Sequence, residues 1–368
     1  MEKRRLREGN EEVILFAGGG TLGPVMPLLA VWEAWKQQHP RARGVWIGTP
    51  GGPEQAWVKR AGLDWKTLPP ARFPRYPSTE WIFLPWRLVV GWAKSVRILR
   101  AERPQLVATA GGYTAVPVAF AARLFRIPIW AHQQDFTLSL TNRLLTPIAS
   151  LITTVWPDSV QDFPVGRAQW VGNPVPSFRT TDRVEAARAF GLDPSKPLVL
   201  VFGGGGGATW INQMMFKIAP RLLTRANVLH LTGKGKMDPV FQTFGSAYVV
   251  RECLVGREKE QAWAAADVIV CRAGMGTIAD LSAWKKPAVI IPLPDSPQEA
   301  NARELEKRGA AVVLLQKKTK PDEAVAVVER ILSHEEERSI FSARVGRLFP
   351  TLEATEKVVK ELGKLTLV

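Results

Sequence analysis

Residues 14–35 read ILFAGGGTLGPVMPLLAVWEAW, and this stretch decides the fold of the first half of the chain. An apolar run typical of a buried strand leads into a glycine turn, and a helix-length apolar segment follows. Glycine turns of this kind let the backbone approach a phosphate group at the start of a helix. Pro24 and Pro27 stand near the helix start, where a reactive side chain could be expected, although proline has no titratable group.

The same pattern returns in the second half as VFGGGGGATWINQMM, residues 201–215. Strand-like apolar runs alternate with helix-length segments, five in the first half and four in the second, which predicts an α/β fold with two doubly wound parallel sheets. The segment VGNPVPSF at 171–178 marks the join. We therefore expect an N-terminal domain of residues 1–174, to which a C-terminal helix at 351–368 returns, and a C-terminal domain of residues 175–350. Ligands of such sheets bind at the carboxyl ends of the strands, which favours a cleft between two facing domains.

The composition indicates a cytosolic protein with an anionic partner. The 368 residues are 46% hydrophobic but contain neither an apolar run of about 18 residues nor a signal peptide. Cys253 and Cys271 lack metal-site spacing and are expected in the core. The net charge of +15 favours nucleic acid, acidic lipid or a phosphorylated substrate. Because no zinc finger, RNP strand or basic zipper is present, no nucleic-acid partner is expected.

The five glycines from Gly203 to Gly207 precede a helix predicted to begin near Ala208. Backbone amides freed by glycine, together with the positive end of the helix dipole, form an anion site suited to a diphosphate. The alternative is a plain tight turn, for which five glycines are more than needed. The sequence has no GxxxxGK[ST], so this is not a Walker loop.

Two further segments of the second half carry polar residues at strand ends. Arg272 and Gly274 follow a buried strand, and Asp280 falls early in the next helix, where its carboxylate could accept both hydroxyls of a ribose. Asp280 could equally be a partner of the helix dipole. Gln298 and Asn301 stand three apart at another helix start and suit sugar hydroxyls or, alternatively, a helix cap.

His132 follows a strand of the first half and is succeeded by Gln133, Gln134 and Asp135. Polar residues at the carboxyl end of a strand favour a cleft wall. A single histidine in a fold of this size is also commonly structural, so both interpretations stand.

Residues 71–103 combine aromatic side chains with seven Lys or Arg against two Glu. Aromatic anchors beside cations are typical of a surface that binds an anionic bilayer, because the rings lie at headgroup depth and the cations meet phosphates. The alternative is a core helix with a solvated basic face. The candidate membrane residues are Trp81, Ile82, Phe83, Leu84, Trp86 and Trp92.

Eight motifs, spread over about residues 13–360, make the chain similar to the MurG family, the peptidoglycan glycosyltransferases that convert lipid I to lipid II. In order they are AGGGTLGPVMPLLAV, ATAGGYTAVPVAFAARLFRIPIWAHQQD, LTNRLL, VGNPV, VFGGGGGA, TGKG, CRAGMGTIADL and QEANA. The resemblance implies a GT-B fold, that is, two Rossmann-like domains. It also implies inverting transfer of N-acetylglucosamine from UDP-N-acetylglucosamine to an undecaprenyl-linked N-acetylmuramoyl-pentapeptide, by a peripheral protein on the cytoplasmic face of the cell membrane. No cofactor or metal is expected, and no DxD carboxylate pair lies beside the proposed diphosphate loop.

The resemblance assigns the donor to the second domain and the acceptor to the membrane-facing first domain. Donor-binding positions are Gly203, Gly204, Gly205, Gly206, Gly207, Ala208, Arg272, Gly274, Met275, Gly276, Thr277, Asp280, Gln298, Asn301 and Asn173. Acceptor-side positions are Gly19, Gly20, Gly23, Gly111, Gly112, Tyr113 and Gln134. The candidate catalytic residues are His132, Asp135 and Thr21.

The chain departs from the family pattern at several positions. Pro24 stands where the family has a histidine thought to assist the acceptor hydroxyl, and the family's HEQN is HQQD at residues 132–135. Pro176 replaces an arginine, Gly205 a serine, and Pro297 a polar residue. A divergent transferase could use His132 or Asp135 to activate its acceptor, with Arg272 stabilising the leaving group. The alternatives are a transferase for another lipid-linked acceptor, or a non-catalytic protein that binds nucleotide sugar or membrane.

Overall fold

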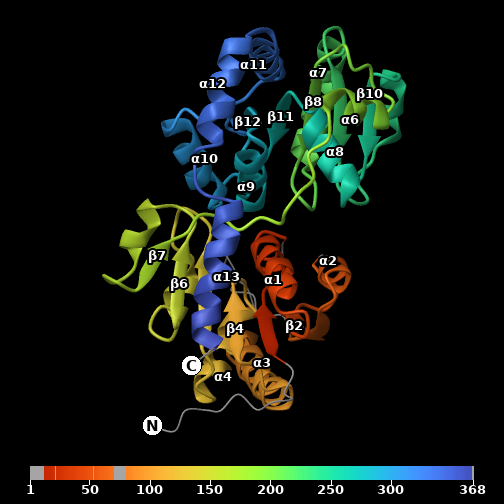
Figure 1. Cartoon of the computed structure of the whole chain (residues 1–368). Coiled ribbons are helices and arrows are strands. Elements are labelled where there is room, and N and C mark those ends of the chain that lie inside the picture. Colours follow the sequence, from red (N-terminus) through yellow and green to blue (C-terminus); the bar gives the residue numbers. More distant parts are fainter. Residues whose placement is uncertain (1–11, 21, 53, 70–79, 367–368) are drawn as a thin grey trace. The chain divides into compact units, whose positions relative to one another are not determined.

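The computed structural model describes residues 12–20, 22–52, 54–69 and 80–366. The chain forms two compact units: unit 1 comprises Met1–Pro176 and Phe349–Val368, and unit 2 comprises Ser177–Leu348. Each unit is built on one parallel sheet with helices on both faces (Figure 1). Within the described residues, no helix is both long enough and apolar enough to cross a membrane.

The sheet of unit 1 has seven parallel strands in the order β3-β2-β1-β4-β5-β6-β7. Its strands are β1 (Val13–Ala17), β2 (Arg43–Gly48), β3 (Asp64–Thr67), β4 (Leu106–Thr109), β5 (Ile129–Gln133), β6 (Leu151–Thr154) and β7 (Ala168–Trp170). Its helices are α1 (Met26–Gln38), α2 (Gln55–Arg60), α3 (Glu80–Glu102), α4 (Ala115–Leu124), α5 (Leu140–Leu145), the 3-10 helix η1 (Asp158–Asp162) and α13 (Leu352–Thr366).

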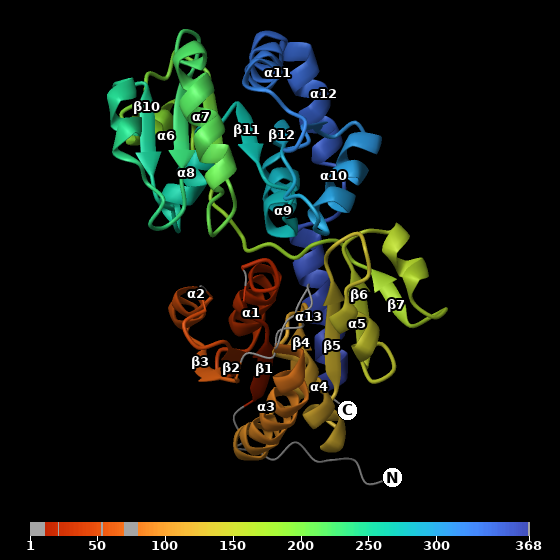
Figure 2. The same cartoon turned by 180° about the vertical axis from the view of Figure 1, so that it is seen from behind.

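Alternation along β1 divides the core of unit 1 into two layers. Ile14 and Phe16 pack with residues of α1 and α13, whereas Leu15 and Ala17 pack with residues of α3 and α4 on the opposite face. In Figure 1, α13 accordingly runs beside α1, and Figure 2 shows α3 next to α4. Because both faces are covered, β1 is apolar throughout, as expected for a central parallel strand.

The sheet of unit 2 has six parallel strands in the order β10-β9-β8-β11-β12-β13. Its strands are β8 (Leu198–Phe202), β9 (Asn227–Leu231), β10 (Tyr248–Arg251), β11 (Val268–Cys271), β12 (Ala288–Ile290) and β13 (Val312–Val313). Its helices are α6 (Arg183–Ala189), α7 (Thr209–Leu222), η2 (Pro239–Phe244), α8 (Arg257–Ala265), α9 (Met275–Trp284), α10 (Gln298–Lys307), α11 (Pro321–Ser333) and α12 (Glu335–Val345). Cys271 is buried in β11, but the expectation of a core position for Cys253 is wrong: it lies exposed in the loop after β10.

Candidate active site

The second glycine turn forms a closed loop between β8 and α7 in unit 2. The N–H of Gly207 donates to Gly204 O at 3.0 Å. Gly207 has φ +67°, a conformation that glycine adopts readily, and a Cβ there would collide with Thr232 O, so the loop packs directly on the segment after β9. Helix α7 begins at Thr209 with no side-chain cap and no acid in its first turn. This helix start can therefore bind an anion.

Lys236 contacts the same loop from the segment TGKGK, residues 232–236. Its Nζ donates to Gly206 O at 2.8 Å and to Gly207 O at 3.4 Å. The sequence analysis did not single out this lysine. The sequence feature that could have identified it is the pair of lysines, Lys234 and Lys236, directly after β9, the strand that pairs with β8.

Arg272 lies at the carboxyl end of β11 and is only 6% exposed. Its Nη1 donates to Ile291 O at 3.0 Å and Pro292 O at 2.9 Å, and its Nη2 donates to Gln316 Oε1 at 2.6 Å. Burial lowers the pKa of this guanidinium. These bonds tie β11 to the segments that follow β12 and β13. Three of the five guanidinium N–H groups are thus used within the chain, and the contact of Arg272 with a leaving group stays a prediction.

The next turn presents the start of α9 and the predicted ribose-binding acid. Gly274 occupies the N-cap position of α9 and offers no side chain to cap it. The predicted positions Met275, Gly276 and Thr277 form the first turn of this helix. The carboxylate of Asp280 accepts a hydrogen bond from Lys259 Nζ of α8 at 2.7 Å and remains partly exposed. Lys259 thus fixes one carboxylate oxygen, Oδ2, which leaves Oδ1 for a ligand.

Gln298 and Asn301 of α10 both approach the Ala273–Gly274 turn. Asn301 is fully buried, and its Nδ2 donates to Ala273 O at 3.2 Å. Gln298 Oε1 accepts from Leu293 N–H at 3.0 Å, and its Nε2 lies 3.9 Å from where a Cβ on Gly274 would stand. Asn301 has no exposed surface and supports the turn through this hydrogen bond, and its contact with the donor sugar stays a prediction. Neither side chain caps α10.

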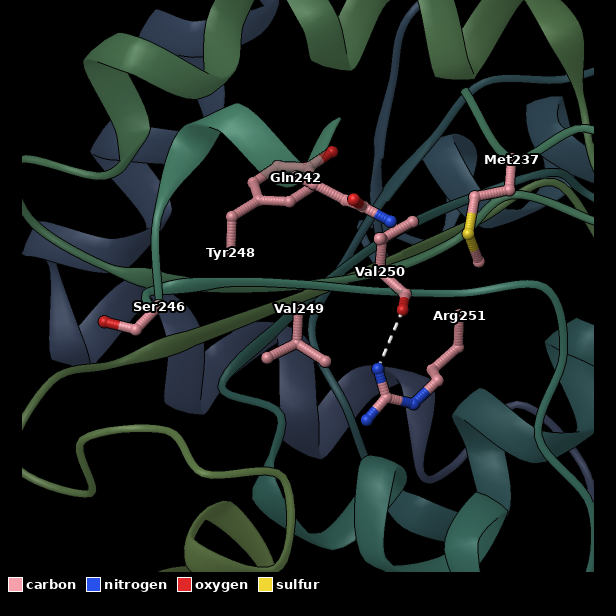
Figure 3. Close-up of a pocket in the computed structure, with 7 residues that line it drawn as sticks. All are labelled: Met237, Gln242, Ser246, Tyr248, Val249, Val250 and Arg251. Carbon is pink, nitrogen blue, oxygen red and sulfur yellow. Dashed lines mark hydrogen bonds between the residues drawn. The ribbon is translucent and has the colours of Figure 1, made fainter. Parts of the chain in front are cut away.

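A surface pocket of unit 2 lies along the edge strand β10, and none of the predicted donor residues lines it (Figure 3). Arg251 donates from Nη1 to Val250 O at 2.9 Å within it. The pocket is lined by Met237, Gln242, Ser246, Tyr248, Val249, Val250 and Arg251.

In unit 1, the turns after β1 and β4 meet because these strands are neighbours in the sheet. A Cβ on Gly112 would stand 3.1 Å from Gly19 O, and one on Gly20 would stand 2.7 Å from the ring of Tyr113. The predicted acceptor-side residues of the two turns are therefore brought together. Gly23 and Pro24 follow in the turn before α1 and are partly buried. Thr21 lies outside the described residues.

His132 is fully buried in β5, with its Nδ1 at 2.8 Å from Thr153 Oγ1. Burial lowers its pKa to about 3, against smaller opposing effects of hydrogen bonds with Asn173 and Thr153. A base with this pKa is a poor proton acceptor near neutral pH, and the ring has no exposed surface. His132 as a substitute base stays a prediction, and these properties favour the partly exposed Asp135 for that role. The predicted donor residue Asn173 belongs to unit 1 and lies buried beside this ring.

Gln133 holds the loop that carries Asp135. Its Nε2 donates to Asp135 O at 2.7 Å and Thr137 O at 2.9 Å, while its Oε1 accepts from Asn142 Nδ2 at 2.7 Å and from Ser139 N–H at 3.3 Å. Asp135 is partly exposed at the end of β5, whereas Gln134 beside it is buried. Asp135 is thus a partly exposed carboxylate at the strand end where the motif predicted one.

Glu54 is a buried acid of unit 1 that the sequence analysis did not identify. It has no exposed surface, and its Oε1 accepts from Thr49 N–H at 3.1 Å and Thr49 Oγ1 at 2.9 Å. A Cβ on Gly19 would stand 2.5 Å from the same oxygen. Glu54 therefore anchors the loop after β2 beside the first glycine turn. The sequence feature that could have identified Glu54 is an acid directly after the segment GTPGGP, residues 48–53.

Three helices that contact one another in series, α3, α4 and α5, expose large apolar side chains on unit 1. On α3 the exposed fractions are 56% for Phe83, 68% for Trp86 and 39% for Trp92, whereas the predicted Leu84 is buried at 5%. The side chains of Trp81 and Ile82 lie outside the described residues. The apolar patch consists of Phe83, Trp86, Val89, Trp92, Phe120, Leu124, Phe125, Leu140 and Leu144.

Comparison with known proteins identifies the family. The models of the glycosyltransferase family 28 N-terminal and C-terminal domains match residues 14–154 and 198–347. The UDP-N-acetylglucosamine–N-acetylmuramyl-(pentapeptide) pyrophosphoryl-undecaprenol N-acetylglucosamine transferase of a Nocardioides species is 34% identical over 95% of this chain and 98% of its own. The enzyme of the same name from Listeria welshimeri is 33% identical over 95% of this chain and 99% of its own. The chain belongs to the MurG family of glycosyltransferases.

Solved structures confirm the fold expected for a MurG family member. MurG of Acinetobacter baumannii superposes with a TM-score of 0.72 at 23% identity, covering 96% of this chain and 99% of that one. The kitacinnamycin glycosyltransferase gives a TM-score of 0.74 at 15% identity, covering 97% and 99%. Two parallel-sheet α/β units with these neighbours make the fold GT-B, as predicted. Against the MurG pattern, Pro24, Gln133 and Asp135 are departures that lie at the candidate site of unit 1.

Proposed function

We propose that the protein transfers N-acetylglucosamine from UDP-N-acetylglucosamine to an undecaprenyl-linked N-acetylmuramoyl-pentapeptide, the step from lipid I to lipid II. Membership of the MurG family supports this assignment. The observation that supports it is the Gly203–Gly207 loop before the uncapped α7, a geometry that suits the diphosphate of a nucleotide sugar. In this proposal unit 2 binds the donor and unit 1 binds the acceptor.

The reaction is a direct displacement at the anomeric carbon, with inversion. An acceptor hydroxyl attacks, its proton passes to a base, and UDP leaves towards the Gly203–Gly207 loop. Asp135 is the proposed base, because Pro24 has no titratable group and His132 is buried with a pKa of about 3. Asp280 holds the ribose of the donor through the oxygen that Lys259 leaves open. Loss of one general base typically costs about 10²- to 10⁴-fold in rate.

The apolar patch is the proposed membrane-binding surface, which would place the protein on the cytoplasmic face of the cell membrane. Exposed apolar side chains on consecutive helices are costly in water and favour insertion at headgroup depth. Arg97, Arg123, Arg126 and Arg143 are exposed on the same helices or beside them and would attract anionic lipid. Trp86→Ser should weaken sedimentation with phosphatidylglycerol vesicles, while phosphatidylcholine vesicles bind both proteins poorly. Equal binding of the variant and the wild type to the anionic vesicles would refute this surface.

The deciding experiment measures UDP release from UDP-N-acetylglucosamine with a soluble lipid I analogue. Asp135→Asn should reduce turnover by about 10² or more while UDP affinity is retained. Asp158→Asn is the matched control, an acid of unit 1 in η1 that the mechanism does not use. Measurable UDP binding without any turnover would refute the transferase and favour the alternative, a MurG-like protein that binds nucleotide sugar without catalysis. Absence of UDP binding would refute the donor site itself.

A further inference from the structure

We propose that Lys236 is a positioning residue for the diphosphate of the nucleotide donor. The inference rests on the proposed function, because it concerns the loop assigned to the donor. Lys236 Nζ donates to two successive carbonyls of that loop, Gly206 O at 2.8 Å and Gly207 O at 3.4 Å. No other side chain of the described residues has a recorded hydrogen bond to the Gly203–Gly207 loop.

The two hydrogen bonds fix the direction of two peptide groups. In a trans peptide the C=O and N–H bonds point in opposite directions, so carbonyls that face Lys236 turn the corresponding N–H groups away from it. One of these, Gly207 N–H, closes the turn to Gly204 O at 3.0 Å. The other belongs to Ala208, directly before α7. Glycine peptides rotate more freely than others, and Lys236 therefore selects one orientation of a loop that glycine leaves loosely determined.

Lys236 also places a positive charge beside the Gly203–Gly207 loop, which Arg272 and Gly205 do not provide. Arg272 directs its N–H groups to Ile291, Pro292 and Gln316 of its own chain. Gly205 has no hydroxyl to offer. Among the described residues, no carboxylate pairs with Lys236, so its positive charge is not neutralised within unit 2. An exposed cation held on the loop carbonyls favours an anionic ligand at that loop.

Lys234 provides a matched control, because it is exposed two residues away and forms no hydrogen bond or ion pair with the described residues. Calorimetric titration with UDP and with uridine compares Lys236→Met, Lys236→Arg and Lys234→Met with the wild type. Lys236→Met should weaken UDP binding about tenfold or more, the range for loss of a charge-assisted hydrogen bond. Uridine has no phosphate, so its affinity should not change. Lys236→Arg should restore most of the UDP affinity, and Lys234→Met should have less than about a threefold effect.

Three outcomes would overturn the inference while leaving the donor site intact. Lys236→Met could bind UDP as the wild type does, Lys234→Met could lose as much affinity, or uridine affinity could fall in parallel with that of UDP. The second outcome would assign the effect to net charge, and the third to the structure of unit 2. If the wild type binds no UDP, the proposed function fails together with the inference. Thermal unfolding of each variant, expected at the wild-type temperature, separates misfolding from lost contacts.

Discussion

Gln133→Glu restores the residue that the MurG family has at this position, and the structure predicts that it harms the protein. Gln133 is 1% exposed, and its Nε2 donates to two carbonyls, Asp135 O at 2.7 Å and Thr137 O at 2.9 Å. A carboxylate would place an acceptor oxygen against both of them. Its other oxygen could still accept from Asn142 Nδ2, as Oε1 does now.

The expected loss follows from these contacts. Two hydrogen bonds contribute about 1 kcal/mol each, and the two carbonyls left facing a carboxylate add to the cost, which gives about 2–4 kcal/mol in all. For a unit of this size the unfolding temperature should fall by roughly 5–15 °C. Burial and the opposing carbonyls raise the pKa of the introduced carboxyl in the folded state. The folded state then binds the proton more tightly than the unfolded state, so the loss should be small at low pH and should grow as pH rises through that pKa.

Scanning calorimetry at pH 5 and pH 8 measures this loss, and UDP release with the lipid I analogue measures activity. Gln105→Glu is a suitable control, because Gln105 Oε1 accepts from Val13 N–H at 2.7 Å and a carboxylate can still accept this bond. The reasoning fails if Gln133→Glu unfolds at the wild-type temperature at pH 8. It also fails if the substitution raises turnover, since the family residue would then be compatible with this loop.

Three other outcomes are expected. Gly207→Ala should lower UDP affinity by about tenfold or more, since the methyl group would collide with Thr232 O at a position with φ +67°, and Gly245→Ala, with a positive φ but open space around it, controls for backbone strain alone. Lys259→Met should weaken binding of UDP more than of 2′-deoxy-UDP, because it releases the Asp280 carboxylate that is proposed to hold the ribose, and equal losses would contradict this role for Asp280. Burial lowers the folded-state pKa of His132 to about 3, below its unfolded value. The stability that the neutral ring contributes is therefore present above about pH 6.5 and is lost as pH falls towards 3. His132→Gln should reduce the pH dependence of the unfolding free energy in this range, and an unchanged pH dependence would contradict the lowered pKa.

The sequence predicted the strands of both sheets where apolar runs were long, but not the short edge strands. β3, β7, β10 and β13 have two to four residues each, and several of their side chains are only partly buried. Such segments form strands because an adjacent strand of the sheet provides the backbone hydrogen-bonding partners. This tertiary effect is not visible in the local sequence pattern. The long runs at β1 and β8 are central and buried, and their patterns were sufficient.

At the candidate site, the sequence predicted which residues lie at the carboxyl ends of strands but not how their side chains point. Gly20 meets Tyr113 because β1 and β4 are neighbours in the sheet, an order that the sequence analysis did not predict. The directions taken by Arg272 and Asn301 depend on carbonyls contributed by distant segments. The contact of Lys236 with the glycine loop depends likewise on how two loops pack together, which no spacing along the chain reveals.

The departures from the MurG pattern in unit 1 are consistent with one another. Val25 N–H and Met26 N–H both donate to Leu22 O, at 3.2 and 3.3 Å, so the turn before α1 forms without an N–H at Pro24. In the segment HQQD the acid stands two residues later than in the family's HEQN, and Gln133, at the vacated position, donates to the backbone of the residue that now carries it. The chain thus lacks a titratable group at Pro24 and keeps a partly exposed carboxylate at Asp135, on a loop held by a buried amide. Because Gln133 and Asp135 are joined by this hydrogen bond, exchanging either one alone for the residue of the MurG pattern should not restore the family's arrangement.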